Sequence, residues 1–259
     1  MELKKWKMEL QDHVATLTID NPPVNILSSP VMAELEALID EVNSNNEIKV
    51  AVLTGTGSVF IAGADIKEIF RIGNKKEGEA LARKGQKIFS RIENSPKPFI
   101  AAINGVCLGG GTELAMACHI RIAGEQAHLG QPEISLGLIP GFGGTQRLAR
   151  LTNKSTAMEL ILSGEGITAQ EAFRIGLVNR VVADEDVLKA AQELGGKIAL
   201  KGGVAIAKSL DAIHNGLDMT LEEGLEYEAK LFGETCETED MKEGVAAFLE
   251  KRAPQFKNK

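Results

Sequence analysis

Two glutamates lie in surroundings where a carboxylate could move protons. Glu113 follows the glycine cluster 109–111 after one threonine and directly precedes the apolar run 114–118. Glu133 is a lone acid shortly before a second glycine-rich stretch. Two such carboxylates could divide acid and base roles if burial raised the pKa of one of them. A first-turn glutamate favoured by a helix dipole and a solvated loop glutamate are the simpler alternatives, and the residues alone leave them open.

Two segments, 62–67 (AGADIK) and 109–113 (GGGTE), each begin with small residues just before an expected helix. The first backbone N–H groups of a helix have no intrahelical partner. Two such groups that converge on one point would stabilise a developing oxyanion, and small residues would leave the backbone open to a ligand. Tight turns or close packing would explain the same glycines equally well.

A third glycine pair, Gly55 and Gly57, follows an expected strand and resembles the opening of a dinucleotide-binding fingerprint. The third glycine of that fingerprint would fall at Phe60, and no helix begins directly after it. A plain glycine turn is therefore expected there.

Composition and charge narrow the classes of function. The net charge of −7 and the absence of a Lys/Arg run argue against an extended nucleic-acid surface. The four histidines show no metal-ligand spacing, so no metal site is expected. The odd number of cysteines without CxxC spacing favours reduced thiols. With neither a secretory signal nor a stretch of ~18 apolar residues, no membrane association is expected. We expect a cytoplasmic protein, or a matrix protein if it is a processed mitochondrial form.

Short strands alternate with helices in the first half of the chain. Strands are expected at 14–19, 50–53, 99–103, 120–123 and 127–129. Helices are expected from Ser29, over 76–93 and over 113–118, and then over 186–200, 204–215, 221–234 and 238–251. Capping boxes are expected at Thr168–Glu171 and at Thr220–Glu223. This pattern predicts an α/β core over 1–195 that carries a helical segment over 196–259.

Three ordered segments resemble the crotonase superfamily, and the enoyl-CoA hydratases in particular. They are 62–67, 104–114 and 131–148, the last of which has the sequence QPEISLGLIPGFGGTQRL. The resemblance extends over essentially the whole chain. It implies a spiral of repeated ββα units whose C-terminal helices mediate assembly into a homotrimer, or into a homohexamer of two stacked trimers.

The resemblance also implies roles for individual residues. The backbone amides of Ala64 and Gly110 would form an oxyanion hole for the acyl thioester oxygen. Glu113 and Glu133 would hold one water; Glu113 would chiefly assist its attack at C3, while Glu133 would deliver a proton at C2. The backbone of Gly141 would help to place that water.

Further positions match those that lie along coenzyme A in relatives. They are Val24, Ala62, Asp65, Ile66 and Lys67, with Phe256 and Lys259 as candidate contacts from a neighbouring subunit. His119 stands where relatives often have aspartate, and we expect it to make a local hydrogen bond at the start of a strand.

The implied reaction is the reversible hydration of a short-chain 2-enoyl-CoA to a 3-hydroxyacyl-CoA, a step of fatty-acid β-oxidation. It requires no metal or redox cofactor, since coenzyme A is part of the acyl-CoA substrate. Two alternatives stay open, which are another acyl-CoA dehydratase or isomerase on the same fold and an RNA-binding protein without enzyme activity.

Overall fold

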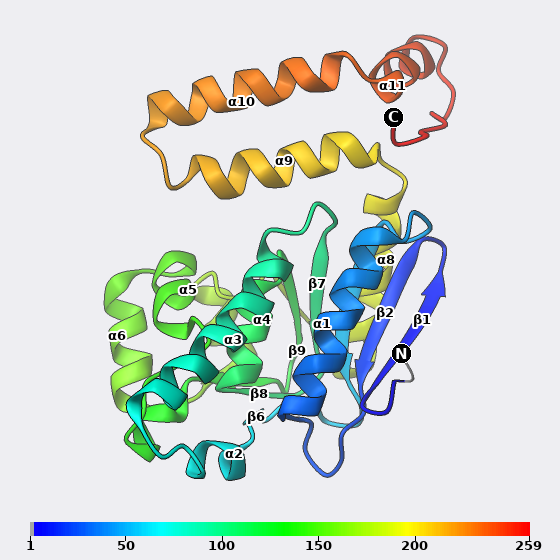
Figure 1. Cartoon of the computed structure of the whole chain (residues 1–259). Coiled ribbons are helices and arrows are strands. Elements are labelled where there is room, and N and C mark those ends of the chain that lie inside the picture. The colour runs from blue at the N-terminus through cyan, green and yellow to red at the C-terminus, as the bar shows by residue number, and fades with distance from the viewer. Residues whose placement is uncertain (1–2) are drawn as a thin grey trace.

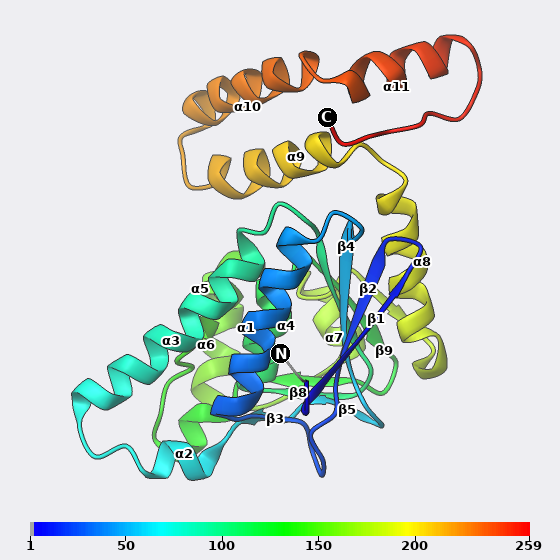
Figure 2. The same cartoon turned by 45° about the vertical axis from the view of Figure 1, so that its right-hand side comes forward.

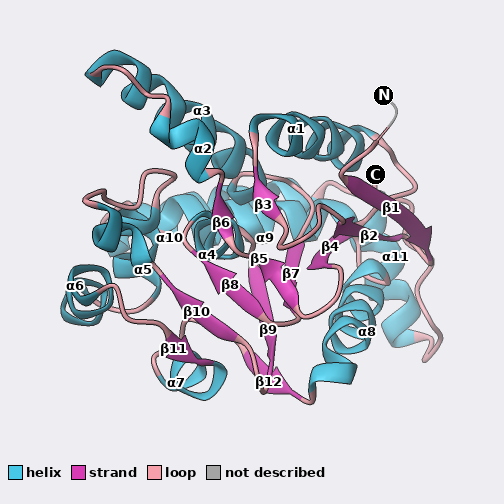
Figure 3. Ribbon diagram, turned by 90° about the horizontal axis from the view of Figure 1, so that it is seen from below, coloured by secondary structure: helices cyan, strands magenta, loops and turns pink. Residues whose placement is uncertain are grey.

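Strands from successive parts of the chain assemble into two sheets and a separate strand pair (Figure 3). The computed structural model describes residues 3–259. In the larger sheet the order is β1 (Trp6–Gln11), β2 (Val14–Ile19), β4 (Val50–Gly55), β7 (Phe99–Ile103), β9 (Ile120–Gly124) and β12 (Arg180–Val182). In the smaller sheet it is β11 (Ile167–Thr168), β10 (His128–Gly130), β8 (Val106–Leu108) and β5 (Val59–Ile61). The strands β3 (Ile26–Leu27) and β6 (Gly63–Ala64) pair with each other in parallel.

The helices follow the strands in a repeating order. Their bounds are α1 (Ser29–Ser44), α2 (Ile66–Phe70), α3 (Lys75–Glu93), α4 (Gly110–Ala117), the 3₁₀ helix η1 (Pro132–Leu136), α5 (Gly144–Leu151), α6 (Lys154–Ser163), α7 (Ala169–Arg174), the 3₁₀ helix η2 (Asp184–Asp186), α8 (Val187–Ala199), α9 (Gly203–Gly216), α10 (Leu221–Cys236) and α11 (Glu239–Leu249). Three times the chain adds one strand to the larger sheet, then one to the smaller sheet, and then a helix: β4–β5–α3, β7–β8–α4 and β9–β10–α5. This order confirms the expected spiral of ββα units.

The central strands are apolar on both faces because helices cover both sides of the larger sheet (Figure 2). One face, with Leu53 and Ala101, belongs to a large core that also includes residues of α1 and α3. The other face, with Val52 and Ile100, packs with residues of α8. Helix α4 is buried over its whole length, which explains why its run of apolar residues shows no polar face.

Most predicted elements agree with the structure, and the differences have local causes. Helix α4 begins at Gly110 rather than at 113, so Gly110 and Gly111 belong to its first turn and only Gly109 precedes it, as the N-cap. The capping box at Thr220 is complete. At Thr168 only one half of the predicted box forms, because the Glu171 carboxylate pairs with Arg174 at 2.6 Å instead of returning to the cap.

The last helices extend away from the core (Figures 1 and 2). α9 and α10 pack against each other, and several large apolar side chains of this helix pair are exposed, including Leu217 (82%) directly after α9 and Phe232 (67%) in α10. The predicted division of the chain at residues 195 and 196 stays a prediction, as does trimerisation. Among residues 3–259 no helix combines the length and apolar character needed to cross a membrane, and the cytoplasmic location also stays a prediction.

Candidate active site

The Ala64 amide points from the short strand β6 toward the start of α4. Asp65 N donates to Leu27 O at 3.2 Å, so that amide faces β3. Because N–H groups alternate in direction along a strand, the Ala64 N–H faces the opposite side. A Cβ added to Gly110 would lie 3.5 Å from Ala64 N, which places the first residue of α4 on that side.

The Gly110 amide belongs to the open first turn of α4. The first backbone hydrogen bond of this helix runs from Glu113 N to Gly109 O at 3.0 Å, so the helix itself leaves the Gly110 N–H without a partner. Gly109 has φ 52°, in the left-handed region that favours glycine. A Cβ on Gly111 would lie 2.3 Å from Ile61 O, which explains the third glycine by close packing. The structure thus brings the amide-bearing residues Ala64 and Gly110 together.

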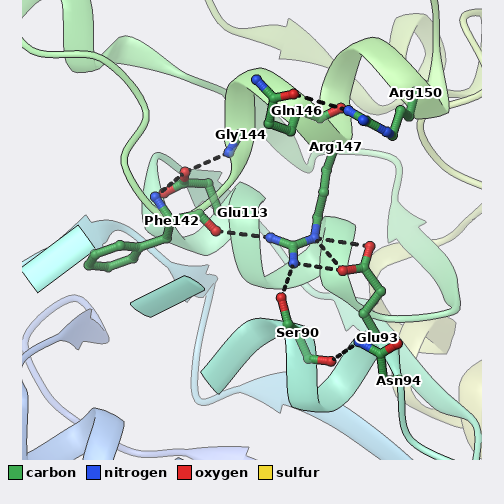
Figure 4. A network of polar contacts seen from close by, with 9 residues as sticks. All are labelled: Ser90, Glu93, Asn94, Glu113, Phe142, Gly144, Gln146, Arg147 and Arg150. Carbon is green, nitrogen blue, oxygen red and sulfur yellow. Dashed lines mark hydrogen bonds and ion pairs between the residues drawn. The ribbon is translucent and has the colours of Figure 1, made fainter. Parts of the chain in front are cut away.

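Glu113 is 2% exposed and is held by two backbone donors of the loop before α5 (Figure 4). Its Oε1 accepts hydrogen bonds from Phe142 N and Gly144 N, each at 2.7 Å. Burial, with a smaller contribution from Glu133, raises the pKa of Glu113 to about 7 against the opposing effect of the two amides. Glu113 is therefore close to half-ionised at neutral pH.

Glu133 lies in η1, on the other side of the glycine turn. A Cβ added to Gly109 would be 3.0 Å from Glu133 Oε1. Its Oε2 is buried and has no hydrogen-bond partner among the described residues. Burial raises the pKa of Glu133 above its usual range. Gly109 connects the two acids in space, since its carbonyl accepts from Glu113 N and its added Cβ would approach Glu133, so these glutamates, 20 residues apart in sequence, lie on either side of one residue.

A small cavity of about 20 Å³ lies near Gly110, with both apolar residues and the polar side chains of Ser29, Glu68 and Lys84 in its lining. Leu27 and Phe142 are on its wall, and both approach Gly110: an added Cβ there would lie 3.1 Å from Leu27 Cδ1 and 3.7 Å from Phe142 Cδ2. The Phe142 ring packs edge-to-face on Phe89 with centroids 5.7 Å apart. It occupies the space above Gly85, where a Cβ would be 2.3 Å from the ring.

Two residues at the site were missed by the sequence reasoning. Gln131 is 1% exposed, and its Nε2 donates to Gly109 O at 2.8 Å, which holds the glycine turn. Arg147 binds the loop that carries the Glu113 donors, since its Nη1 donates to Phe142 O at 2.9 Å. Both residues are in the third matched segment, but no sequence pattern distinguishes them from other polar residues of the chain.

The residues predicted to contact coenzyme A differ in their exposure to solvent. Val24, Ile66 and Lys67 are exposed, and Ala62 is half-buried. The Asp65 carboxylate caps α2 by accepting from Lys67 N at 2.8 Å. Their contact with a cofactor arm stays a prediction.

Phe256 and Lys259, the candidate contacts from a neighbouring subunit, make contacts within their own chain in the structure. Phe256 packs at Gly244 and Gly202, and Lys259 O accepts from Asp240 N at 3.1 Å. Their predicted contact with a neighbouring active site stays a prediction. The backbone O of Gly141 accepts from Gln86 Nε2 at 2.9 Å, and its predicted role with water also stays a prediction.

His119 behaves as expected for a residue at the start of a strand. Its Nδ1 accepts from Phe99 N at 2.9 Å, and its own N–H donates to Phe99 O at 2.9 Å. Burial lowers its pKa to about 4, so the ring is neutral at pH 7. Among residues 3–259 no group of three or more His, Cys, Asp or Glu side chains could hold a metal ion.

Comparison with known proteins agrees with this geometry. The family model described as enoyl-CoA hydratase/isomerase matches residues 9–259. This chain belongs to that family. It is 48% identical over 251 residues to a probable enoyl-CoA hydratase of Bacillus subtilis, covering 96% of this chain and 97% of the relative. It is 44% identical to a short-chain-enoyl-CoA hydratase of Clostridium acetobutylicum, with both chains covered completely.

Solved structures of the enoyl-CoA hydratase/isomerase family show the same fold. An enoyl-CoA hydratase from Bacillus anthracis superposes with a TM-score of 0.95 at 39% identity, covering 99% of this chain and all of that one. The expected crotonase-type architecture is therefore confirmed, as is the family expected from the three matched segments.

Proposed function

We propose that this enzyme adds water reversibly across the 2,3 double bond of a short-chain 2-enoyl-CoA to give a 3-hydroxyacyl-CoA, as a step of fatty-acid β-oxidation. One observation carries the proposal: the carboxyl groups of buried Glu113 and half-buried Glu133 lie on either side of the glycine turn at 109–110, and Ala64 lies close to Gly110 in that turn. The names of the relatives support it, because they include a crotonyl-CoA hydratase of Syntrophomonas wolfei that is 41% identical.

The amides of Ala64 and Gly110 would hold the thioester oxygen. Attack of water at C3 pushes electrons through C2 onto that oxygen, so its negative charge grows toward the transition state. Donors aimed at the growing charge lower the barrier selectively. The Gly110 amide adds the positive end of the α4 dipole to this effect.

The two glutamates would hold the water and move its protons. Oε1 of Glu113 already accepts two backbone hydrogen bonds, which leaves Oε2 to take a proton from the attacking water. The unpartnered Oε2 of Glu133 is available to bind the same water and to deliver a proton at C2. A pKa near neutrality suits the base, because it combines a useful ionised fraction with adequate basicity.

A panel of acyl-CoA esters tests the proposal. Crotonyl-CoA should lose its conjugated absorbance when enzyme is added, and chromatography should identify 3-hydroxybutyryl-CoA as the product. A shift of the double bond without uptake of water would indicate an isomerase. If no ester in the panel reacts but RNA binds tightly in a salt-sensitive way, the proposal is wrong.

We expect kcat/KM for hydration to depend on pH through the two carboxyl groups. The activity should fall as the pH drops below about 7, because protonated Glu113 no longer accepts a proton from water. Activity also requires a protonated Glu133, whose pKa burial raises, so ionisation of Glu133 should set the second limb of the profile. Initial rates with crotonyl-CoA from pH 5 to 10 measure both limbs. A flat profile would contradict the assigned roles.

We also propose that the exposed apolar side chains of α9 and α10 are covered by further copies of the chain. Light scattering should give three or six times the chain mass of 27.7 kDa. Replacing both Leu217 and Phe232 by glutamate should lower that mass, since each places a charge on an apolar exposed position. A wild-type mass near one chain would contradict the expectation.

A further inference from the structure

Arg147 connects the loop at Glu113 to helix α3 (Figure 4). Its buried guanidinium donates from Nε and Nη2 to the Glu93 carboxylate, with the shortest contact at 2.7 Å. Its remaining nitrogen, Nη1, donates to Phe142 O at 2.9 Å. The loop therefore receives a hydrogen bond from Arg147 through one carbonyl and donates two through the amides of Phe142 and Gly144 to Glu113.

Other residues around Arg147 fit this arrangement. Ser90 Oγ accepts a hydrogen bond from Nη2 at 3.2 Å. Gly143 has φ 114°, and a Cβ there would lie 2.2 Å from Nη1. Glycine at 143 thus permits both the turn and the close approach of the guanidinium.

We propose that Arg147 is a positioning residue, which Glu93 anchors so that it holds the 141–144 loop with two amides aimed at Oε1 of Glu113. A guanidinium suits this task because its N–H donors form a rigid planar fork. Lysine at 147 would keep the charge but could not grip Glu93 in bidentate fashion while reaching the Phe142 carbonyl. Only the kinetic part of this inference rests on the proposed function.

The charges around Glu113 predict the consequence of losing Arg147. From η1, Glu133 raises the pKa of Glu113, and from α5, Arg147 lowers it. From α3, Glu93 faces Arg147 as its counter-charge. β8 contributes only Cys107, which burial keeps neutral by raising its pKa to about 12, and β5 and β6 have no titratable side chain.

At the far end of α4, Arg121 of β9 donates to the Ala115 carbonyl. Loss of Arg147 would therefore remove a cation that lowers the pKa of Glu113. It would also loosen the two amides that favour the ionised form. Both changes should raise the pKa of Glu113.

The test compares Arg147→Met and Arg147→Lys with Arg150→Met as a matched control. Arg150 is exposed on the same helix, and within residues 3–259 its side chain bonds only to Gln146. In full-length protein labelled with ¹³C-glutamate, NMR follows the Glu113 carboxyl, identified by its loss in Glu113→Gln. We expect its titration midpoint to rise by about one pH unit or more in Arg147→Met and to stay unchanged in Arg150→Met.

Kinetics supply the second measurement. We expect kcat for crotonyl-CoA to fall by about 100-fold in Arg147→Met, with its acid limb moved to higher pH and KM changed much less. Arg147→Lys should lose kcat while its titration midpoint stays closer to that of the wild type, because the charge remains.

An Arg147→Met protein with the wild-type midpoint and wild-type kcat would overturn the inference. Should Arg147→Met fail to fold, Glu93→Gln replaces it as the test, because glutamine still offers an acceptor to the Arg147 guanidinium. A lower kcat and a shifted titration midpoint of Glu113 in Glu93→Gln support the inference. Wild-type values for both overturn it. A wild-type enzyme that hydrates no ester would overturn the proposed function instead, while the NMR midpoints would still test the positioning role.

Discussion

Glu113→Gln and Glu133→Gln are each expected to lower kcat for crotonyl-CoA hydration by about 100- to 10,000-fold. Glutamine keeps the shape of each side chain and can still accept hydrogen bonds. It cannot take a proton from water at C3 or deliver one at C2. Steady-state kinetics with crotonyl-CoA measure the loss, and titration with a non-reacting acyl-CoA should show binding close to that of the wild type.

The Glu113 substitution should also leave a signature in stability. Burial raises the pKa of Glu113 from 4.5 to about 7, so the folded protein binds this proton more tightly than the unfolded chain does. Stability from this group is fully present below about pH 4.5 and is lost as the pH rises toward 7 and above. The loss is on the order of 3 kcal/mol at 1.36 kcal/mol per pKa unit. The melting temperature of Glu113→Gln should therefore exceed that of the wild type at pH 8, and the two melting temperatures should be closer at pH 5.

A glutamate outside the site provides the control for both measurements. Glu125 is exposed, so Glu125→Gln should keep wild-type kinetics and the wild-type dependence of melting on pH. Activity within a few-fold of the wild type in either Glu113→Gln or Glu133→Gln would remove that residue from the proposed mechanism.

Gly110→Ala is expected to lower kcat by about 100- to 1,000-fold, the range for loss of one oxyanion donor. The added Cβ would lie 3.1 Å from Leu27 Cδ1 and 3.5 Å from Ala64 N, in the space where the thioester oxygen would meet both amides. Gly110→Val should lower kcat further, because its additional methyl groups extend into the same space.

Gly196→Ala is the matched control for this substitution. Gly196 lies inside α8, and a Cβ there meets no atom within 4 Å. Alanine should therefore be neutral or slightly stabilising, since it favours a helix more than glycine does. Wild-type kinetics in a folded Gly110→Ala protein would exclude Gly110 from the oxyanion hole.

Much of the architecture was predictable because it depends on local order along the chain. The strand at 99–103 coincides with β7, since a short apolar run between prolines and an Asn-Gly turn has few other solutions. The Thr220 capping box formed because both partners belong to the same helix turn. The predicted box at Thr168 was only half right, because a nearby cation competed for the Glu171 carboxylate.

The residues of the site were predicted from the resemblance of three segments to a known family. Their types and spacing alone were also compatible with simpler roles, such as a first-turn glutamate or a tight glycine turn. Whether Glu113 and Glu133 lie near each other depends on how β8, α4 and η1 pack, which is a property of contacts far apart in sequence. The raised pKa of Glu113 likewise follows from burial of the whole of α4.

The sequence by itself determined the order of strands and helices, the family resemblance and the identity of the candidate acids. Only the tertiary structure placed both acids at the glycine turn where Ala64 lies close to Gly110. Only the fold revealed Arg147, because its partner Glu93 is 54 residues away and the bonds it makes are formed by packing α3 against the loop before α5. Carboxyl pKa values and hydrogen-bond partners depend on burial and on distant groups, so no local pattern of residues encodes them.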